Sequence, residues 1–240
     1  MINLSVARLA QIMVLAIVAV ILAYQSIHSI RANAWYFNAR NTLQQLSSPV
    51  DAAQLTRAEA AITLATKLEP THPHYWHIYA NVKILIASNV DGITAQGSDK
   101  KQLLYQQAEQ ALLTSVALRQ TWAPTWITLA QLVSYQQGPS EQVYGYIQQA
   151  KKVGPHQLDV HLGIIHIALM HWPQLPANYK ALYVNALQLA VKHGYRFNAV
   201  FALAKKINRL EILCLTLQFS EGFAPVRASY HFKKHCKTPR

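Results

Sequence analysis

Two stretches of the chain resemble each other at a fixed offset of 50 residues. Residues 61–80 read AITLATKLEPTHPHYWHIYA, and residues 111–130 read ALLTSVALRQTWAPTWITLA. Each copy ends one helical apolar pattern, makes a short turn with proline, and opens a second helical pattern with a bulky ring. A helical hairpin cannot bury its apolar stripe alone, so the repetition predicts hairpins that stack on one another. The residues expected to fill the space between stacked helices are a tryptophan and an alanine in each copy: Trp76, Ala80, Trp126 and Ala130.

The rest of the chain follows the same periodicity. Apolar residues recur at spacings of three and four, while glycine and proline are sparse and strand signals are weak. A weaker third copy of the repeat covers residues 150–165. The sequence therefore predicts an all-α fold. The expected helices cover residues 51–68, 73–88, 99–119, 124–136, 140–152, a segment that ends near residue 170, then 179–193 and 197–218.

The N-terminal segment is the most apolar part of the chain. Leu9–Tyr24 has Gln11 as its one polar residue, and apolar character continues on both sides. A membrane-spanning helix needs about 20 apolar residues, and this segment reaches that length if Arg8 extends to the lipid–water interface. A cleaved signal peptide is the alternative, but the Ala-Asn-Ala site at residues 32–34 lies too far beyond the apolar stretch. We expect an uncleaved anchor that contacts the membrane through residues 4–30.

These patterns divide the chain into four parts. We expect an anchor with its flanks at residues 1–31, a juxtamembrane linker at 32–50, a helical repeat domain at 51–218 and a basic, irregular tail at 219–240. Basic residues flank the apolar segment on both sides, so the positive-inside rule gives no firm orientation.

Charge is scarce and uneven. Only 13% of residues are charged against 52% hydrophobic, so part of the apolar excess is expected in lipid or at an interface. Residues 192–240 hold ten Lys and Arg with two acids, out of a net charge of +12. Such a surface favours anionic lipid or acidic glycan, and nucleic acid is not expected if the domain is exported. The candidate contacts are Lys233, Lys234 and Lys237, and a merely solvated terminus is the alternative.

The two cysteines, Cys214 and Cys236, lie near the C-terminus. In an exported protein an even pair indicates a disulfide, whereas in a reducing compartment two separate thiols are expected. The pair therefore favours an oxidising location for the part of the chain that follows the anchor.

Motifs for catalysis or metal binding are weak. Glycan hydrolysis needs two carboxylates in one cleft. The ten acids of this chain form no close pair within one helical turn. His156, His161, His166 and His171 recur every five residues, which places neighbours about 140° apart on a helix and excludes one ligand face. We therefore expect no enzyme, no cofactor and no metal. Trp122, four residues before Trp126, offers a ring for sugar stacking, although aromatic spacing of this kind is more typical of repeat packing.

The repeats carry a family resemblance. Helices of the form Ala-x3-(Ile/Leu) that end in Leu-x-Pro, as at residues 61–70, resemble tetratricopeptide repeats. Residues 118–126, LRQTWAPTW, following a short anchor, resemble the VpsP-type exopolysaccharide biosynthesis family, with Gln120 where that motif commonly carries proline. Proline stops a helix more strongly than glutamine, so a weaker helix stop is expected there.

The resemblance has consequences for fold and function. It implies a transmembrane helix followed by a tetratricopeptide-like α-solenoid, single-pass in a bacterial inner membrane, with the soluble domain in the periplasm. It implies a scaffold that holds polysaccharide polymerase or export proteins together, and it brings no catalytic residues. The alternatives are an acidic-glycan-binding module that uses Trp122 and the basic tail, and a glycan-modifying enzyme.

Overall fold

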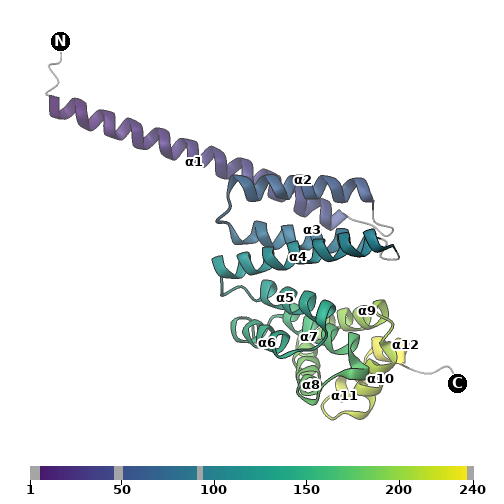
Figure 1. The fold of residues 1–240 in the computed structure, drawn as a ribbon. Coiled ribbons are helices and arrows are strands. Elements are labelled where there is room, and N and C mark those ends of the chain that lie inside the picture. Colours follow the sequence, from purple (N-terminus) through teal and green to yellow (C-terminus); the bar gives the residue numbers. More distant parts are fainter. Residues whose placement is uncertain (1–5, 46–50, 91–93, 237–240) are drawn as a thin grey trace. The chain divides into compact units, whose positions relative to one another are not determined.

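The computed structural model describes residues 6–45, 51–90 and 94–236, and every regular element in these ranges is helical (Figure 1). The chain divides into two compact units, Met1–Leu118 and Arg119–Arg240. The predicted all-α fold, with a long apolar N-terminal helix followed by helical hairpins, is confirmed.

The first unit contains two helical hairpins. The first pairs α1 (Val6–Gln45) with α2 (Ala52–Leu68), and the second pairs α3 (Pro73–Asn89) with α4 (Ala95–Leu118). Helix α2 also packs on α3, so the two hairpins share one core. Small side chains let the helix backbones approach closely around one large ring. The core residues are Ala32, Ala39, Ala58, Ala61, Ile62, Ala65, Tyr75 and Val82.

The expected linker at residues 32–50 is instead the packed half of α1. The helix continues without a break to Gln45, and the remaining residues 46–50 lie outside the described part of the chain. Ala32 and Ala39 are fully buried, and Tyr36 and Leu43 pack against the same cluster. These four residues lie three or four apart on one helical face, so they form the apolar stripe of a hairpin helix. The linker prediction is therefore wrong for residues 32–45.

One turn geometry recurs three times. Four residues separate α2 from α3, α4 from α5 and α6 from α7, and in each case the last of them, His72, Trp122 or Gln157, precedes the next helix. The indole of Trp76 donates a hydrogen bond of 2.6 Å to the carbonyl of Pro70, and Trp126 donates one of 2.7 Å to Gln120. Helix α4 ends at Leu118, the position equivalent to Leu68 of α2, so the helix stops at the same place with Gln120 as with Pro70.

The repeated residues have distinct roles in this geometry. Ala80 and Ala130 are fully buried, as close helix packing requires. The tryptophans are half-buried, and the indole N–H of each is bonded to its own turn. The Trp126 ring also lies 6.0 Å from the ring of Tyr146 on the paired helix α6. In the third copy the position that corresponds to Trp76 is occupied by His161, which is 2% exposed.

The second unit begins with two further hairpins. Helix α5 (Ala123–Gln137) pairs with α6 (Glu141–Val153), and α7 (Leu158–Met170) pairs with α8 (Ala177–Val191) after a short 3-10 turn, η1 (Trp172–Gln174). Helix α5 also packs on α7. Gly163 of α7 permits this contact, because a Cβ atom there would lie 2.2 Å from Cγ1 of Ile127.

In the C-terminal part of the unit we expected one long helix and an irregular tail. The structure instead has several short helices that continue to Cys236. A 3-10 turn, η2 (Gly194–Phe197), leads into α9 (Asn198–Lys206), and then follow α10 (Leu210–Phe219), α11 (Ala224–Ala228) and α12 (Tyr230–Cys236). The predicted helix 197–218 breaks at Asn208, which has a φ of 55°, a conformation that asparagine tolerates. The helices at residues 224–236 bury the side chains of Val226 and Phe232. We did not predict these helices because the segment is rich in basic residues.

Candidate functional site

The outer half of α1 is exposed and apolar. From Leu9 to Ile30 its large hydrophobic side chains are about half exposed or more. At 1.5 Å per residue these residues extend for roughly 33 Å, which matches the hydrocarbon thickness of a bilayer at about 30 Å. Within the described residues, this one helix is long and apolar enough to cross a membrane.

A polar cluster fastens α1 to the first turn where the exposed half ends. Glu69, in the turn between α2 and α3, accepts hydrogen bonds of 3.3 Å from the hydroxyl of Ser29 on α1 and from the hydroxyl of Tyr75 on α3. The Tyr75 ring is fully buried and stacks on His72 at 4.1 Å. Burial, and then the negative charge of Glu69, raise the pKa of Tyr75, so the phenol stays protonated and keeps donating.

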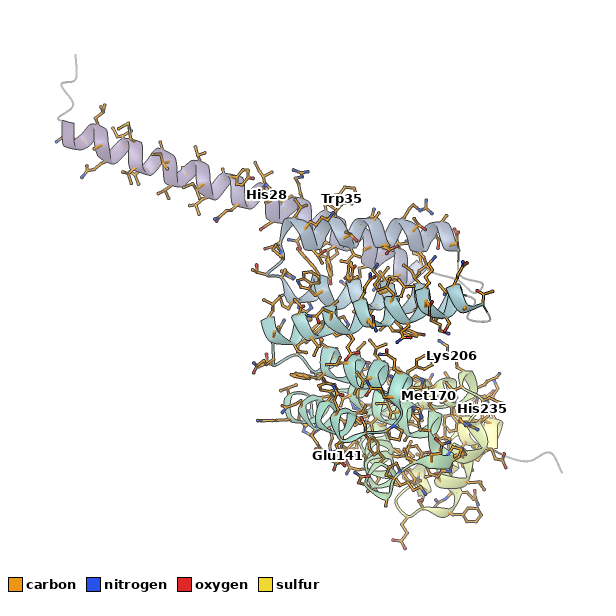
Figure 2. All side chains as sticks on the ribbon, viewed as in Figure 1. His28, Trp35, Glu141, Met170, Lys206 and His235 are labelled. Carbon is orange, nitrogen blue, oxygen red and sulfur yellow. A yellow bond between two sulfur atoms is a disulfide. The ribbon has the colours of Figure 1, made fainter. Side chains whose placement is uncertain are left out.

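This fastening makes the anchor part of the folded unit. Figure 2 shows His28 and Trp35 on the stretch of α1 that approaches α2. The same helix therefore carries the apolar segment and the packed stripe, with no hinge residue between them.

The structure separates the residues that we proposed as a glycan or partner contact. Trp122 is half-buried at the N-terminus of α5. Lys233 and Lys234 are exposed on α12, at the opposite end of the second unit (Figure 1). Lys237 lies outside the described residues. Trp122 and the two lysines thus form no common surface.

A disulfide closes the C-terminal helices into one module. Cys214 of α10 is bonded to Cys236 of α12. Arg227 of α11 donates hydrogen bonds to the carbonyls of Leu217 at 2.9 Å and Ser220 at 3.2 Å, where α10 ends and its unpaired carbonyls attract a cation. Arg227 therefore stabilises the module, because its guanidinium group is held by hydrogen bonds within the protein.

Three rings stack between α9 and α12 in this module. Phe201 of α9 lies 6.2 Å from the ring of His231 and 5.7 Å from that of His235, with nearly parallel planes. Burial, and then Lys234, His231 and Lys205, lower the pKa of His235. The seam between these helices is therefore aromatic and lies in a positive field.

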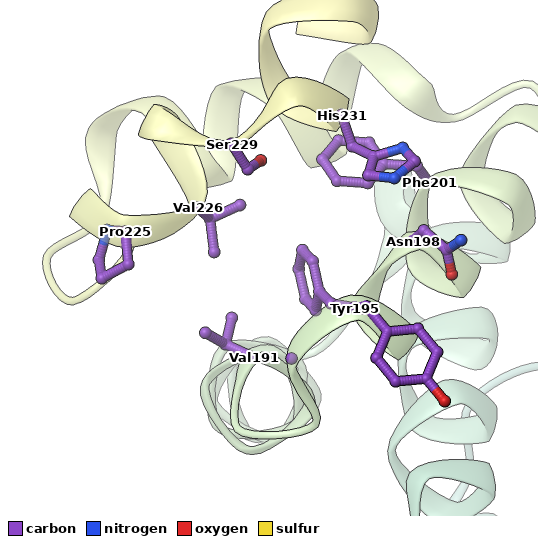
Figure 3. A pocket seen from close by; sticks show the side chains of 10 residues that line it. Val191, Tyr195, Asn198, Phe201, Pro225, Val226, Ser229 and His231 are labelled. Atoms are coloured by element: carbon purple, nitrogen blue, oxygen red, sulfur yellow. The ribbon is translucent and has the colours of Figure 1, made fainter.

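A cavity of about 290 Å³ opens beside this seam (Figure 3). It lies between the end of α8, η2 and α9 on one side and α11 and α12 on the other, and its lining combines apolar side chains with four polar ones. The sequence predicts one helix at residues 197–218 and an irregular tail here, and it did not predict this cavity. The spacing of Phe197 and Phe201, four residues apart on one helical face, was the available signal.

Helix α7 carries two histidines, of which His161 is buried and His166 is partly buried. Within the described part of the chain, no three His, Cys, Asp or Glu side chains are grouped so that they could hold a metal ion. Nδ1 of His166 forms a hydrogen bond of 2.9 Å with the side-chain amide of Gln131. Nε2 of His161 is buried without a hydrogen-bond partner. Burial, and then His193, His156 and Lys151, lower the pKa of His161 to about 4.

We expect His161 to make the protein less stable in acid. Above pH 6.5 the ring is neutral in the folded and unfolded states. Between pH 6.5 and about 4 the unfolded state binds a proton that the folded state does not bind, so the free energy of unfolding falls by up to ~1.4 kcal/mol per pH unit. His161→Leu is expected to remove this contribution, which melting curves recorded between pH 7.5 and 4.5 will measure.

The exposed residue His156 supplies the matched control for this experiment. Because His156 is only a minor cause of the lowered pKa of His161, after burial and His193, His156→Gln is expected to change the acid dependence of the melting temperature much less than His161→Leu. His77, whose pKa burial and then His74 lower to about 4, retains its own acid sensitivity in both variants. Parallel stability curves for His161→Leu and the unmodified chain would contradict the role that we assign to His161.

Comparison with known proteins does not name a family. No protein-family model matches the sequence, and a search of curated proteins finds no similar protein.

Proposed function

We propose that the protein is a membrane-anchored adaptor, whose helical hairpins hold partner proteins at a membrane surface. One observation carries this proposal: α1 is at once the apolar segment and the first packed helix of the hairpins. A continuous helix that is fixed by Ser29 and Glu69 at its midpoint keeps the first unit at a set distance and orientation from the lipid. Such a rigid attachment suits positioning of partners rather than bond-making.

The proposal extends to location and partners. We place the protein in a bacterial inner membrane as a single-pass protein, with its hairpins in the periplasm. The disulfide between Cys214 and Cys236 supports this placement, because disulfides persist in oxidising compartments. The resemblance to the VpsP-type family supports polysaccharide polymerase or export proteins as the partners, since repeats of helical hairpins offer extended surfaces for protein contacts.

Site-specific photocrosslinking in native membranes tests the adaptor proposal. A photoreactive residue at Leu103 of α4, which is exposed and apolar, is expected to give a discrete adduct with another membrane or glycan-assembly protein. The matched control is Gln110, exposed on the same helix. If no exposed apolar position in either unit gives an adduct above the control, the proposal is wrong.

A topology reporter tests the location separately. An enzyme that is active only in the periplasm is fused to the C-terminus, and its cytoplasmic counterpart is fused to a second copy of the chain. We expect activity from the periplasmic reporter alone. Activity from the cytoplasmic reporter alone would overturn the periplasmic placement and leave the adaptor proposal to the crosslinking experiment.

A further inference from the structure

We propose that the cavity between α9 and α12 binds a small amphipathic anion, with an apolar body of one ring or a short acyl chain and a single carboxylate. The cavity lies within the second unit, and its argument uses only that unit. The inference is therefore independent of the adaptor function proposed above.

The size and the walls of the cavity define the body of the ligand. At about 290 Å³ it lies at the small end of ligand pockets, which span roughly 300–1,000 Å³, so it accepts one small group. Figure 3 shows Val191, Pro225 and Val226 along one side. These side chains offer no hydrogen bonds, and a ligand hydroxyl placed against them would lose its water without compensation. An apolar body fits this side better than a sugar.

Polar groups also line the cavity. Asn198, Ser229 and His231 lie among the lining residues and bring an amide, a hydroxyl and an imidazole to the same cavity (Figure 3). Each of these groups is able to donate a hydrogen bond to a carboxylate. Asn198 and His231 lie across the cavity from Val191 and Pro225, and Ser229 lies beside Val226, so an amphipathic ligand is expected to place its head between α9 and α12 (Figure 3).

The surrounding charge selects an anion. Lys192 and Arg196 are exposed and directly follow the lining residues Val191 and Tyr195, and Lys205 and Lys234 lie one turn beyond Phe201 and His231. Among the residues that the structure describes as lining the cavity, none is acidic. Low-dielectric walls close to positive charges concentrate ligands of negative charge.

The fold holds both sides of the cavity in place before a ligand arrives. The side formed by α11 and α12 is tied to α10 by the Cys214–Cys236 disulfide and by the hydrogen bonds of Arg227. The other side begins at the core residues Phe197 and Phe201. Because little has to be ordered on binding, even a ligand of few atoms is expected to bind measurably.

Ligand-observed NMR on the full chain in lipid nanodiscs tests the proposal, with benzoate as the probe. We expect saturable binding with a Kd of about 1 mM or lower, within the range for so few atoms. Val191→Phe fills the apolar side and is expected to weaken binding more than tenfold. Arg196→Gln is expected to weaken it about threefold or more, whereas Lys152→Gln, the same charge change on exposed α6, leaves it unchanged.

Three related probes make the outcome decisive. Benzyl alcohol keeps the apolar body without the charge, inorganic phosphate keeps charge alone, and glucuronate places the carboxylate on a polar body. All three are expected to bind at least tenfold more weakly than benzoate. Glucuronate binding as tightly as benzoate would overturn the proposal in favour of an acidic sugar. Benzoate binding that survives Val191→Phe in a variant with an unchanged melting temperature would show that the ligand binds elsewhere.

Discussion

Replacing Ile17 and Val20 of α1 by arginine is expected to release the protein from the membrane. Each arginine near the centre of a membrane-spanning helix costs about 2.5–3.5 kcal/mol on insertion scales, so the pair costs roughly 5–7 kcal/mol. The two side chains are 60% and 68% exposed in the structure, and they make no contact that the hairpins would lose. The fraction of protein that resists a sodium carbonate wash of the membranes measures the effect.

The control replaces the same two residues by alanine, which shortens the side chains without adding charge. We expect the Ile17→Ala, Val20→Ala variant to stay in the membrane fraction. Mass spectrometry of the mature protein distinguishes an uncleaved anchor from a signal peptide, because cleavage removes Leu9–Tyr24 from the mature chain. If the arginine variant stays in the washed membranes, α1 is not the element that holds the protein there.

The sequence predicted the hairpins well because their signals are local. Proline at the start of α3 and the apolar spacing of α2 to α8 each act within a few turns of helix, and the repeat shows the same local pattern a second time. The hydrogen bonds of Trp76 and Trp126 to Pro70 and Gln120 were beyond such reasoning, because a bulky residue after a turn does not reveal whether its ring points into the core or back over the backbone.

The cavity could not be predicted because its parts are brought together by tertiary packing. Val191 and Phe201 lie on either side of η2. Val226 and His231 follow about 30 residues later in the sequence, on short helices that we did not predict because this segment is rich in basic residues. A similar difficulty affected the packed half of α1, where alanines carry the buried stripe and apolar periodicity is therefore faint. In both places the decisive information is which surfaces meet, and a one-dimensional pattern does not contain it.

Replacing Gly163 by alanine is expected to lower the stability of the protein, whereas replacing Gly145 by alanine is expected to raise it. At Gly163 of α7 the new Cβ would lie 2.2 Å from Cγ1 and 2.9 Å from Cδ1 of Ile127, which is itself buried. Overpacking of this kind costs about 1–3 kcal/mol, which corresponds to a fall in melting temperature of roughly 2–12 °C. At Gly145 of α6 no atom lies within 4 Å, so alanine is expected to stabilise the helix by about 0.5–1 kcal/mol.

A double-mutant cycle shows whether the cost at Gly163 comes from Ile127. Ile127→Ala alone leaves a cavity and is expected to destabilise the protein by about 2–5 kcal/mol. Combined with Gly163→Ala it should cost less than the sum of the two changes, because the added methyl group then enters the space that isoleucine vacated. Chemical denaturation of the four proteins measures this coupling. Additive costs, or a neutral Gly163→Ala, would mean that α5 and α7 do not approach as closely as the structure shows, and that stacking of these hairpins rests on other contacts.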